Sequence, residues 1–225
     1  MPEIINQTFL CDSVPPEIMD RLWATGWRHF GSTFFRYSLS IDENHVRSIT
    51  PLRVDLPRFE LSKSQRRVLR KNEDLRHEFA PATLSMQARL MFQRHKNRFK
   101  DNVPDDLDMF LSPHPATVPC ECVECRVYEG RELIALSYLD IGAESCSAVY
   151  GLFEPDHDWR SLGIYTMLRE LEYSRERGLR YYYPGYATLE PSPYDYKKQL
   201  HGLETLDWDS GDWRRLPRSI PKPQL

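Results

Sequence analysis

The chain has 225 residues, of which 40% are apolar and 28% charged, and its net charge is −3. This composition supports one substantial core and describes a compact globular unit. No run approaches eighteen consecutive apolar residues, and the first twenty residues lack the pattern of a secretory signal. We therefore expect no membrane insertion and no secretion, and we expect a cytoplasmic location.

The five cysteines favour a reducing compartment over a disulfide framework, because their number is odd. Cys120, Cys122 and Cys125 have a spacing that could belong to a metal site. Such a site needs a fourth ligand, however, and neither a second cysteine pair nor a His-x-x-x-His pattern lies nearby. We interpret these residues as structural cysteines on a strand, and we expect no metal and no cofactor.

The N-terminal third alternates between helical and extended patterns. Residues 16 to 25 place apolar side chains at helical spacing, with Pro16 suited to the first turn and Gly26 to the end. Residues 26–41 and 49–57 are aromatic and β-branched and are separated by a turn at 42–44. We expect one short helix followed by a hairpin or small sheet.

The next segment carries a concentrated positive charge. Ser62 and Gln65 form the pattern of a capping box, which predicts a helix over 63–79. A second helix is predicted over 83–99, with His95 as a packing residue. Residues 58–100 hold twelve Lys and Arg against four acids, whereas the rest of the chain holds eighteen against twenty-nine. This asymmetry predicts a localised, salt-sensitive surface for a polyanion.

The C-terminal half reads as strands interrupted by one long helix. Two strands, 121–128 and 132–142, surround a turn and predict an antiparallel hairpin. A third strand at 145–155 precedes a helix with Ser161 as N-cap and Gly178 as its stop. A buried strand follows at 180–186. The tail from Pro217 is expected to be disordered.

The order hairpin, strand, helix, strand is the one that acetyltransferase-like folds use around an acyl-donor site. In such folds the start of the helix presents free N–H groups and a partial positive charge to phosphate. Residues 160–163, Arg-Ser-Leu-Gly, stand at this position. Enzymes that use acyl-CoA carry a more glycine-rich turn at this point. The single Gly163 therefore makes a coenzyme A site less convincing.

Several strings in this chain resemble those of the arginyl- and leucyl-tRNA-protein transferases, which tag acidic N-termini for protein degradation (the N-degron pathway). The strongest is SKSQRRVLRKN at 62–72, and the collinear matches run from about Met19 to Arg215. The other matching segments are GWRHFGSTFFR at 26–36, PLRV at 51–54, SAVY at 147–150, EPDHDWRSLGIYTMLRELE at 154–172, YYYPGY at 181–186 and YKKQLHGLE at 196–204.

The resemblance implies an α+β fold of two tandem acetyltransferase-like (GNAT, dup-GNAT) halves, with mixed and antiparallel sheets flanked by helices. We expect an N-terminal half at 1–61, a catalytic half at 62–216 and a flexible tail at 217–225. The implied enzyme is an aminoacyltransferase that moves leucine or arginine from charged tRNA to an N-terminal Asp or Glu. Its partners would be aminoacyl-tRNA and an acceptor protein or peptide with an acidic N-terminus, without a membrane.

We assign candidate site residues, and the catalytic candidates among them lie at strand ends or within these motifs. A tyrosine or carboxylate can relay a proton or polarise the ester, and a guanidinium fork suits an acidic acceptor side chain. The tRNA-binding candidates are Lys63, Arg66, Arg67, Arg70, Lys71, Ser161, Leu162 and Gly163; the catalytic candidates are Asp140, Tyr150, Tyr186, Tyr196 and Lys197; and the acceptor-binding candidates are Arg36 and Arg76.

The chain also departs from the family pattern. Glu43, Val46 and Ile49 stand where bacterial members carry cysteines, so any regulation through those cysteines should be absent. Ala187 and the segment 191–193 replace a tryptophan and cysteine after the Gly-Tyr of the strand, so we expect the choice of amino acid or acceptor to differ from that of the better-known members.

Three alternatives stay open. An acyl-CoA N-acyltransferase of the same fold would explain the order of elements but not the basic helix. A non-catalytic tRNA-binding relative would bind tRNA and transfer nothing. A transferase acting on a small peptide or metabolite is the third.

Overall fold

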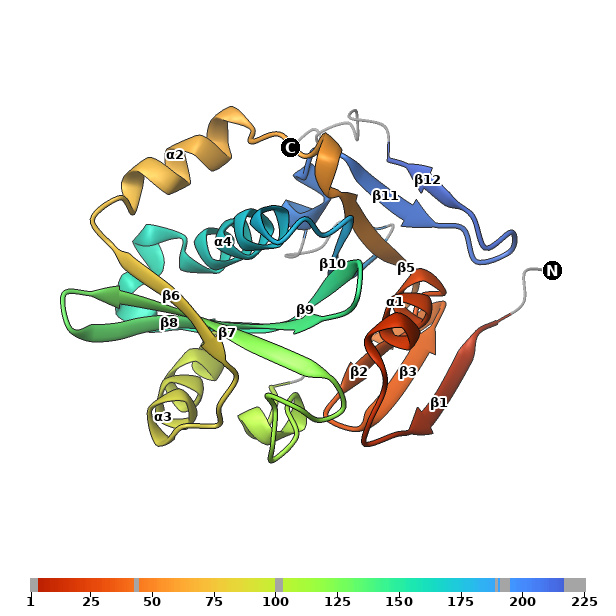
Figure 1. Cartoon of the computed structure of the whole chain (residues 1–225), viewed down its shortest axis with the longest axis horizontal. Helices are drawn as coiled ribbons and strands as arrows, with labels where there is room; N and C mark the ends of the chain where they lie inside the picture. Colours follow the sequence, from red (N-terminus) through yellow and green to blue (C-terminus); the bar gives the residue numbers. More distant parts are fainter. Residues whose placement is uncertain (1–3, 43–44, 100–102, 189, 191–194, 217–225) are drawn as a thin grey trace.

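The computed structural model describes residues 4–42, 45–99, 103–188, 190 and 195–216. Within these ranges nine strands form a central sheet (Figure 1). They are β4 (Leu39–Asp42), β5 (His45–Asp55), β6 (Arg76–Pro81), β7 (Glu121–Glu129), β8 (Glu132–Ile141), β9 (Ser145–Phe153), β10 (Tyr181–Thr188), β11 (Leu203–Leu206) and β12 (Trp213–Arg215). The order across the sheet is β12-β11-β5-β10-β9-β8-β7-β6, and β4 pairs with β5.

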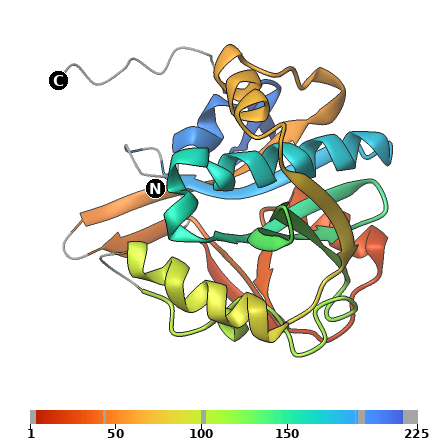
Figure 2. The same cartoon turned by 90° about the vertical axis from the view of Figure 1, so that its left-hand side faces the viewer.

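The sheet is mixed because β9 and β10 are parallel, while the other pairings are antiparallel. Parallel neighbours need a crossover connection, and helix α4 (Leu162–Glu176) supplies it. Helix α4 covers one face of the sheet and α2 (Lys63–Lys71) packs on its outer side, whereas α3 (Met86–His95) lies against the opposite face (Figures 1 and 2). Together these elements make a helix-flanked α+β architecture.

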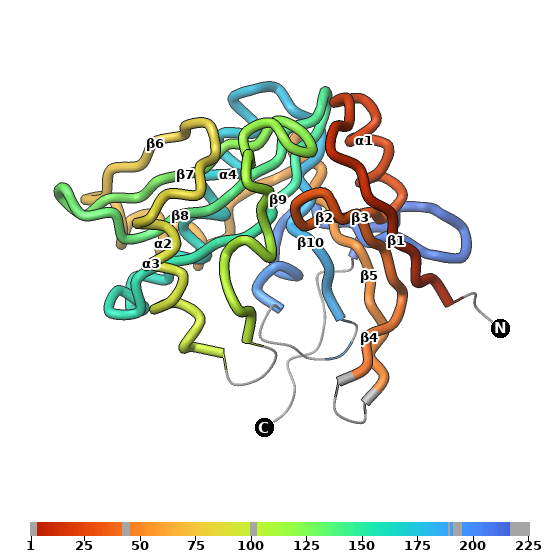
Figure 3. Tube along the Cα trace, turned by 90° about the horizontal axis from the view of Figure 1, so that it is seen from below, coloured from red at the N-terminus to blue at the C-terminus, as the bar shows by residue number. Residues whose placement is uncertain are grey.

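A smaller sheet lies beside the central one (Figure 3). Its strands β1 (Asn6–Leu10), β2 (Arg28–Phe30) and β3 (Thr33–Tyr37) have the order β1-β3-β2, and α1 (Pro16–Ala24) packs next to them. The predicted N-terminal half therefore contains this sheet, while its last strand, β5, pairs with β10 and β11 in the central sheet. The division at residue 61 stays a prediction.

Short 3-10 helices complete the chain and connect these elements. Their bounds are η1 (Leu56–Arg58), η2 (Lys96–Arg98), η3 (Leu107–Met109), η4 (Pro155–Arg160) and η5 (Asp195–Gln199). The predicted tail at 217–225 lies outside the described residues. No helix in the described part of the chain combines the length and apolar character that crossing a bilayer requires.

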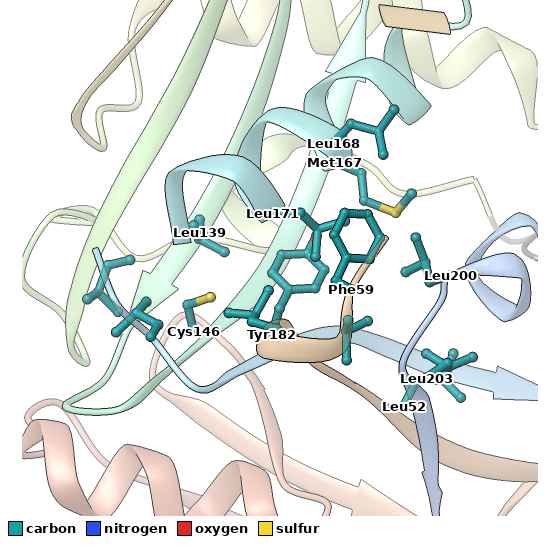
Figure 4. Close-up of a cluster of buried hydrophobic side chains, with 14 of the residues drawn as sticks. Leu52, Phe59, Leu139, Cys146, Met167, Leu168, Leu171, Tyr182, Leu200 and Leu203 are labelled. Atoms are coloured by element: carbon teal, nitrogen blue, oxygen red, sulfur yellow. The ribbon is translucent and has the colours of Figure 1, made fainter. Parts of the chain in front are cut away.

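The largest apolar cluster joins α4 to the sheet (Figure 4). Leu168 and Leu171 of α4 pack there with Leu139 of β8 and Tyr182 of β10, and all four side chains are buried. Full burial of a side chain of this size contributes about 1.5–3 kcal/mol. This cluster holds the crossover helix firmly over β9 and β10, whose ends form the site described below.

Several predicted elements are confirmed. The helix at 16–25 is α1, the capping box at Ser62 and Gln65 is complete, and the hairpin is β7–β8. Gly178 follows the end of α4 with a φ of 72°. His95 is buried and its Nδ1 lies 3.1 Å from both backbone polar atoms of Phe153, as expected of a packing residue.

The predicted helix over 63–79 is wrong beyond Lys71. The side chain of Asn72 donates to the carbonyl of Val68 (3.0 Å) and to that of Arg160 (2.9 Å), which ends α2. Residues 76–81 instead form β6 and pair with β7. Long-range pairing overrides local helix propensity here. The helix predicted over 83–99 is shorter too, because α3 starts at Met86, capped by Ser85, and ends at His95.

Candidate functional site

The parallel strands β9 and β10 separate part-way along their length. Their paired register ends at Tyr183 and Ser147. Pro184 has no N–H for a ladder, Gly185 has a φ of 104°, and the β10–β5 register shifts between Tyr182 and Gly185. The register of β9 with β8 also shifts at this level. The carboxyl ends of parallel strands are where open sheets bind ligands, so this split is the candidate active site.

Arg28 of the small sheet crosses into the split. Its guanidinium donates to the hydroxyl of Ser147 and the carbonyl of Ala148 on one strand, and to the carbonyl of Tyr183 (3.3 Å) on the other. A planar fork with five donors can satisfy backbone carbonyls on both strands at once. Arg28 thereby fixes the separation of the strand ends and brings a positive charge between them.

Lys197 approaches the same point from η5. A Cβ placed on Gly185 would lie 3.4 Å from Lys197 Nζ and 4.0 Å from Arg28 Nη2, so the absence of a side chain at Gly185 gives both cations room. Burial and the charge of Arg28 lower the pKa of Lys197 to about 8. An amine with this pKa exchanges protons readily near neutral pH.

Glu170 of α4 provides the opposing carboxyl group. It is 2% exposed, and the hydroxyl of Tyr182 donates to its Oε2 at 2.6 Å. Burial raises the pKa of Glu170 to about 7, although the hydrogen bond from Tyr182 and the charge of Lys197 act in the other direction. The split is therefore lined by two cations and one carboxyl group, two of which titrate near neutral pH.

Of the predicted catalytic residues, Lys197 and Tyr186 meet at the split. The hydroxyl of Tyr186 donates to the carbonyl of Gly26 (2.7 Å), and burial raises its pKa while the charge of Arg28 lowers it. Asp140 is buried on β8, where its Oδ2 lies 2.8 Å from Nε2 of His29, the residue after Arg28. These residues surround Arg28 from different sides.

The other two catalytic candidates lie in apolar surroundings. Tyr150 of β9 stacks on the ring of Phe110, with centroids 4.1 Å apart, within a cluster on the α3 side of the sheet. Tyr196 packs against the large core cluster beside Lys197. Their catalytic roles stay predictions.

The structure brings the two predicted tRNA-binding groups together. The ammonium group of Lys71, at the end of α2, donates to the carbonyl of Trp159 (2.6 Å), two residues before Ser161. Arg160 pairs with Asp74 (2.9 Å) and with Glu129, and so anchors this junction. The five basic residues of α2 are exposed; they are Lys63, Arg66, Arg67, Arg70 and Lys71.

Ser161 occupies the N-cap position of α4 in an unexpected conformation. Its φ and ψ are 57° and 45°, in the left-handed region, and its side chain makes no capping hydrogen bond. The predicted N-cap is therefore correct in position and wrong in mechanism. Because the cap side chain does not satisfy the first N–H groups of the helix, those of Leu162 and Gly163 are suited to an anion.

The two predicted acceptor clamps lie far apart. Arg36 of β3 donates to Gln7 (2.7 Å) and to the carbonyl of Thr25 (3.0 Å), and its charge acts on Tyr186 at the split. Arg76 lies on β6, three strands beyond β9, where it pairs with Glu78. Strands are about 4.8 Å apart, so Arg76 stands well away from the split.

Sequence reasoning missed Arg28 and Glu170. Arg28 falls inside the matching string at 26–36 but has no local pattern that separates it from a surface arginine. Glu170 does carry a signal, because Thr166, Glu170 and Ser174 stand four residues apart and all three are buried. Thr166 and Ser174 donate to carbonyls of their own helix, so the carboxyl group of Glu170 on the same buried face is the signal that sequence reasoning could have used.

The fold class follows from comparison with a solved structure. The crystal structure of FemX superposes on 89% of this chain and 69% of its own, with a TM-score of 0.52 and 11% identity. The mixed sheet, the crossover helix and the parted strands are those of an acetyltransferase-type fold.

Residues 83–207 match the family model described as the C terminus of arginine-tRNA-protein transferase. An aspartate/glutamate leucyltransferase of Acinetobacter baumannii (strain ATCC 17978) is 30% identical over 92% of this chain and 75% of its own. A protein of the same name from Marinobacter nauticus is 29% identical over 90% of this chain and 84% of its own. The chain belongs to the arginine-tRNA-protein transferase family, and is thus an aminoacyl-tRNA-protein transferase.

The raised pKa of Glu170 makes stability depend on pH. The folded protein holds this proton more tightly than the unfolded chain, whose carboxyl has the ordinary pKa of 4.5. The stabilisation is complete below pH 4.5 and is lost as pH rises through about 7. We expect Glu170→Gln to remove this loss, which amounts to about 3 kcal/mol of unfolding free energy. Denaturant titrations from about pH 4.5 to 8 measure it.

Glu172→Gln, on the exposed side of α4, is the matched control and should retain the wild-type pH dependence. Equal pH dependence in wild type and Glu170→Gln would show that the carboxyl is ionised throughout.

Proposed function

We propose that this protein transfers leucine from leucyl-tRNA to the α-amine of a peptide or protein that begins with Asp or Glu. The names of its relatives support this choice of amino acid and acceptor. The observation that carries the proposal is the contact between α2 and the start of α4, beside the split strands. A tRNA needs a row of basic groups, here called the phosphate track, that binds its phosphates and leads to the reacting ester. In this proposal the contact joins that track, on α2, to the candidate active site.

In this proposal α2 holds the acceptor stem through phosphate contacts. Its basic side chains lie on one exposed helix without an acid between residues 62 and 71. Trp159, at the junction with α4, is 59% exposed although its ring is large and apolar. An exposed aromatic ring beside basic groups suits the stacking of unpaired bases. The N–H groups of Leu162 and Gly163 would then receive a phosphate of the 3′ end.

The reaction itself demands little covalent help, because the ester is already activated. The acceptor amine must lose a proton and attack the ester carbonyl carbon, which forms the C–N bond. We assign the proton acceptor as Lys197, with its pKa of about 8. The C–O ester bond then breaks, and the released tRNA hydroxyl takes the proton back from Lys197. Arg28 positions the strand ends, and Glu170 balances the two cations.

For the acidic acceptor side chain, Arg36 is the better placed of the two predicted clamps. Its guanidinium lies 4.9 Å from the ring of Trp27 and near Tyr186 at the split. A guanidinium recognises a carboxylate in two places. Arg76 remains a prediction that needs the acceptor to extend across the sheet.

Transfer can be measured with radiolabelled amino acids on tRNA and peptides that begin with Asp, Glu or Ala. We expect label from leucyl-tRNA on the Asp and Glu peptides alone. Arg36→Ala and Arg76→Ala are assayed alongside, and loss of the acidic preference identifies the clamp. Transfer of arginine instead would correct the donor. Turnover of acetyl-CoA without any aminoacyl transfer would contradict the proposed function.

Removal of charge from α2 should weaken tRNA binding in a salt-dependent way. The double variant Arg67→Ala/Arg70→Ala loses two phosphate contacts. The slope of log K against log salt, which is negative, should therefore become shallower by about two. Filter binding of tRNA across a salt series measures this slope. The control is Arg21→Ala/Arg214→Ala, two exposed arginines on α1 and β12, which lie on the other side of the molecule from α2 in Figure 1. Equal slopes for both double variants would exclude α2 as the phosphate track.

Lys197→Met should lower kcat for transfer by about 10²–10⁴, the usual contribution of a general base. The neutral amine is the active form, so the wild-type rate should rise with pH and level off above about 8, where Lys197 has lost its proton. Single-turnover rates across a pH series measure both effects. The neighbouring Lys198→Met, whose native ammonium pairs with Asp195, is the control. A pH profile unchanged by Lys197→Met would remove Lys197 from the mechanism.

A further inference from the structure

A buried cluster of three potential metal ligands lies behind Arg28. The side chains of His29, Cys120 and Asp140 are all buried, and their donor atoms lie within 4.8 Å of one another. They come from three separate parts of the fold: β2, the segment before β7, and β8. The sequence motif around Cys120 showed no fourth ligand nearby, because His29 and Asp140 are remote along the chain.

The hydrogen bonds of His29 present its second nitrogen as a ligand. Nδ1 lies 2.9 Å from the carbonyl oxygen of Gly31, which can only accept, so Nδ1 carries the proton. Nε2 of the neutral ring then has a free lone pair, and it lies 2.8 Å from Oδ2 of Asp140. Two acceptors at this distance need a proton or a cation between them. A backbone carbonyl that orients the other ring nitrogen is the usual support of a metal-bound histidine.

The thiols of Cys120 and Cys122 both lie within hydrogen-bond reach of the carboxyl group of Asp140. Two thiols, an imidazole and a carboxylate that converge in this way are typical zinc ligands. Cys122 stands directly opposite Asp140 in the β7–β8 register. Cys122, His29 and Asp140 also line a cavity of about 10 Å³, which is the space that a single small atom or water occupies.

We propose that His29, Cys120 and Asp140, with Cys122 as the fourth ligand, bind one Zn²⁺ ion. Tetrahedral zinc with bonds of 2.0–2.3 Å separates its donor atoms by roughly 3.5 Å. The donors of His29, Cys120 and Asp140, which lie within 4.8 Å of one another, therefore need to move by about 1 Å. With four protein ligands this site is structural, without an open position for substrate. It fastens β2 of the small sheet to β8 of the central sheet, and it thereby holds the neighbouring Arg28 in the split.

Metal analysis of the wild-type protein tests this site directly. The protein is purified without chelators or a histidine tag, and we expect about one zinc per chain. Chelation should lower the melting temperature, and added Zn²⁺ should restore it with release of protons. Cys120→Ser should lose most of the bound zinc. Cys125→Ser is the control, because Cys125 is also buried, on β7, and belongs to a different cluster.

The wild-type measurements do not depend on the folding of any variant. A cobalt-substituted wild-type protein should also show thiolate-to-cobalt charge-transfer absorption, which an aspartate or histidine site alone lacks. Absence of zinc together with no thermal response to added Zn²⁺ would overturn the proposal and leave an imidazolium–carboxylate pair. Stoichiometric iron in place of zinc would overturn the assignment of the metal.

Discussion

The separation of β9 and β10 beyond Ser147 and Tyr183 is the constraint on which the rest of the site depends. Two parallel strands that stayed paired would satisfy their own backbone groups and leave no opening. Pro184 and Gly185 end that pairing, and the carbonyls that the ladder releases need new donors. The guanidinium of Arg28 provides these donors, so the same interaction satisfies the backbone and places charge where the substrate ester would react.

The positive charge of this protein is concentrated in one region of the chain. The net charge is −3, yet the exposed side of α2 is strongly basic. Like charges on one helix repel each other, and α2 is held in place by contacts at its end, where Lys71 donates to the carbonyl of residue 159 and Asn72 to that of residue 160. Bound phosphate groups would relieve this repulsion. The basic residues of α2 are therefore suited to binding and do not stabilise the helix by themselves.

Burial sets the chemistry inside the split. Glu170 and Lys197 would titrate far from neutrality in water, and desolvation moves their pKa values to about 7 and about 8. The pKa of each group also depends on the charge of the other, and that of Lys197 depends on Arg28 as well. A substrate that brings its own charge into the split would therefore shift both pKa values.

The sequence by itself determined the order of elements, the basic helix and the family. These follow from local signals, such as the capping box at Ser62, the hairpin at 121–141 and the collinear motifs. Only the tertiary structure decided that 76–81 is a strand, that Arg28 reaches β9 and β10, and that His29 faces Asp140. These contacts join residues about forty or more positions apart, and their free energy comes from burial and pairing that no local pattern records.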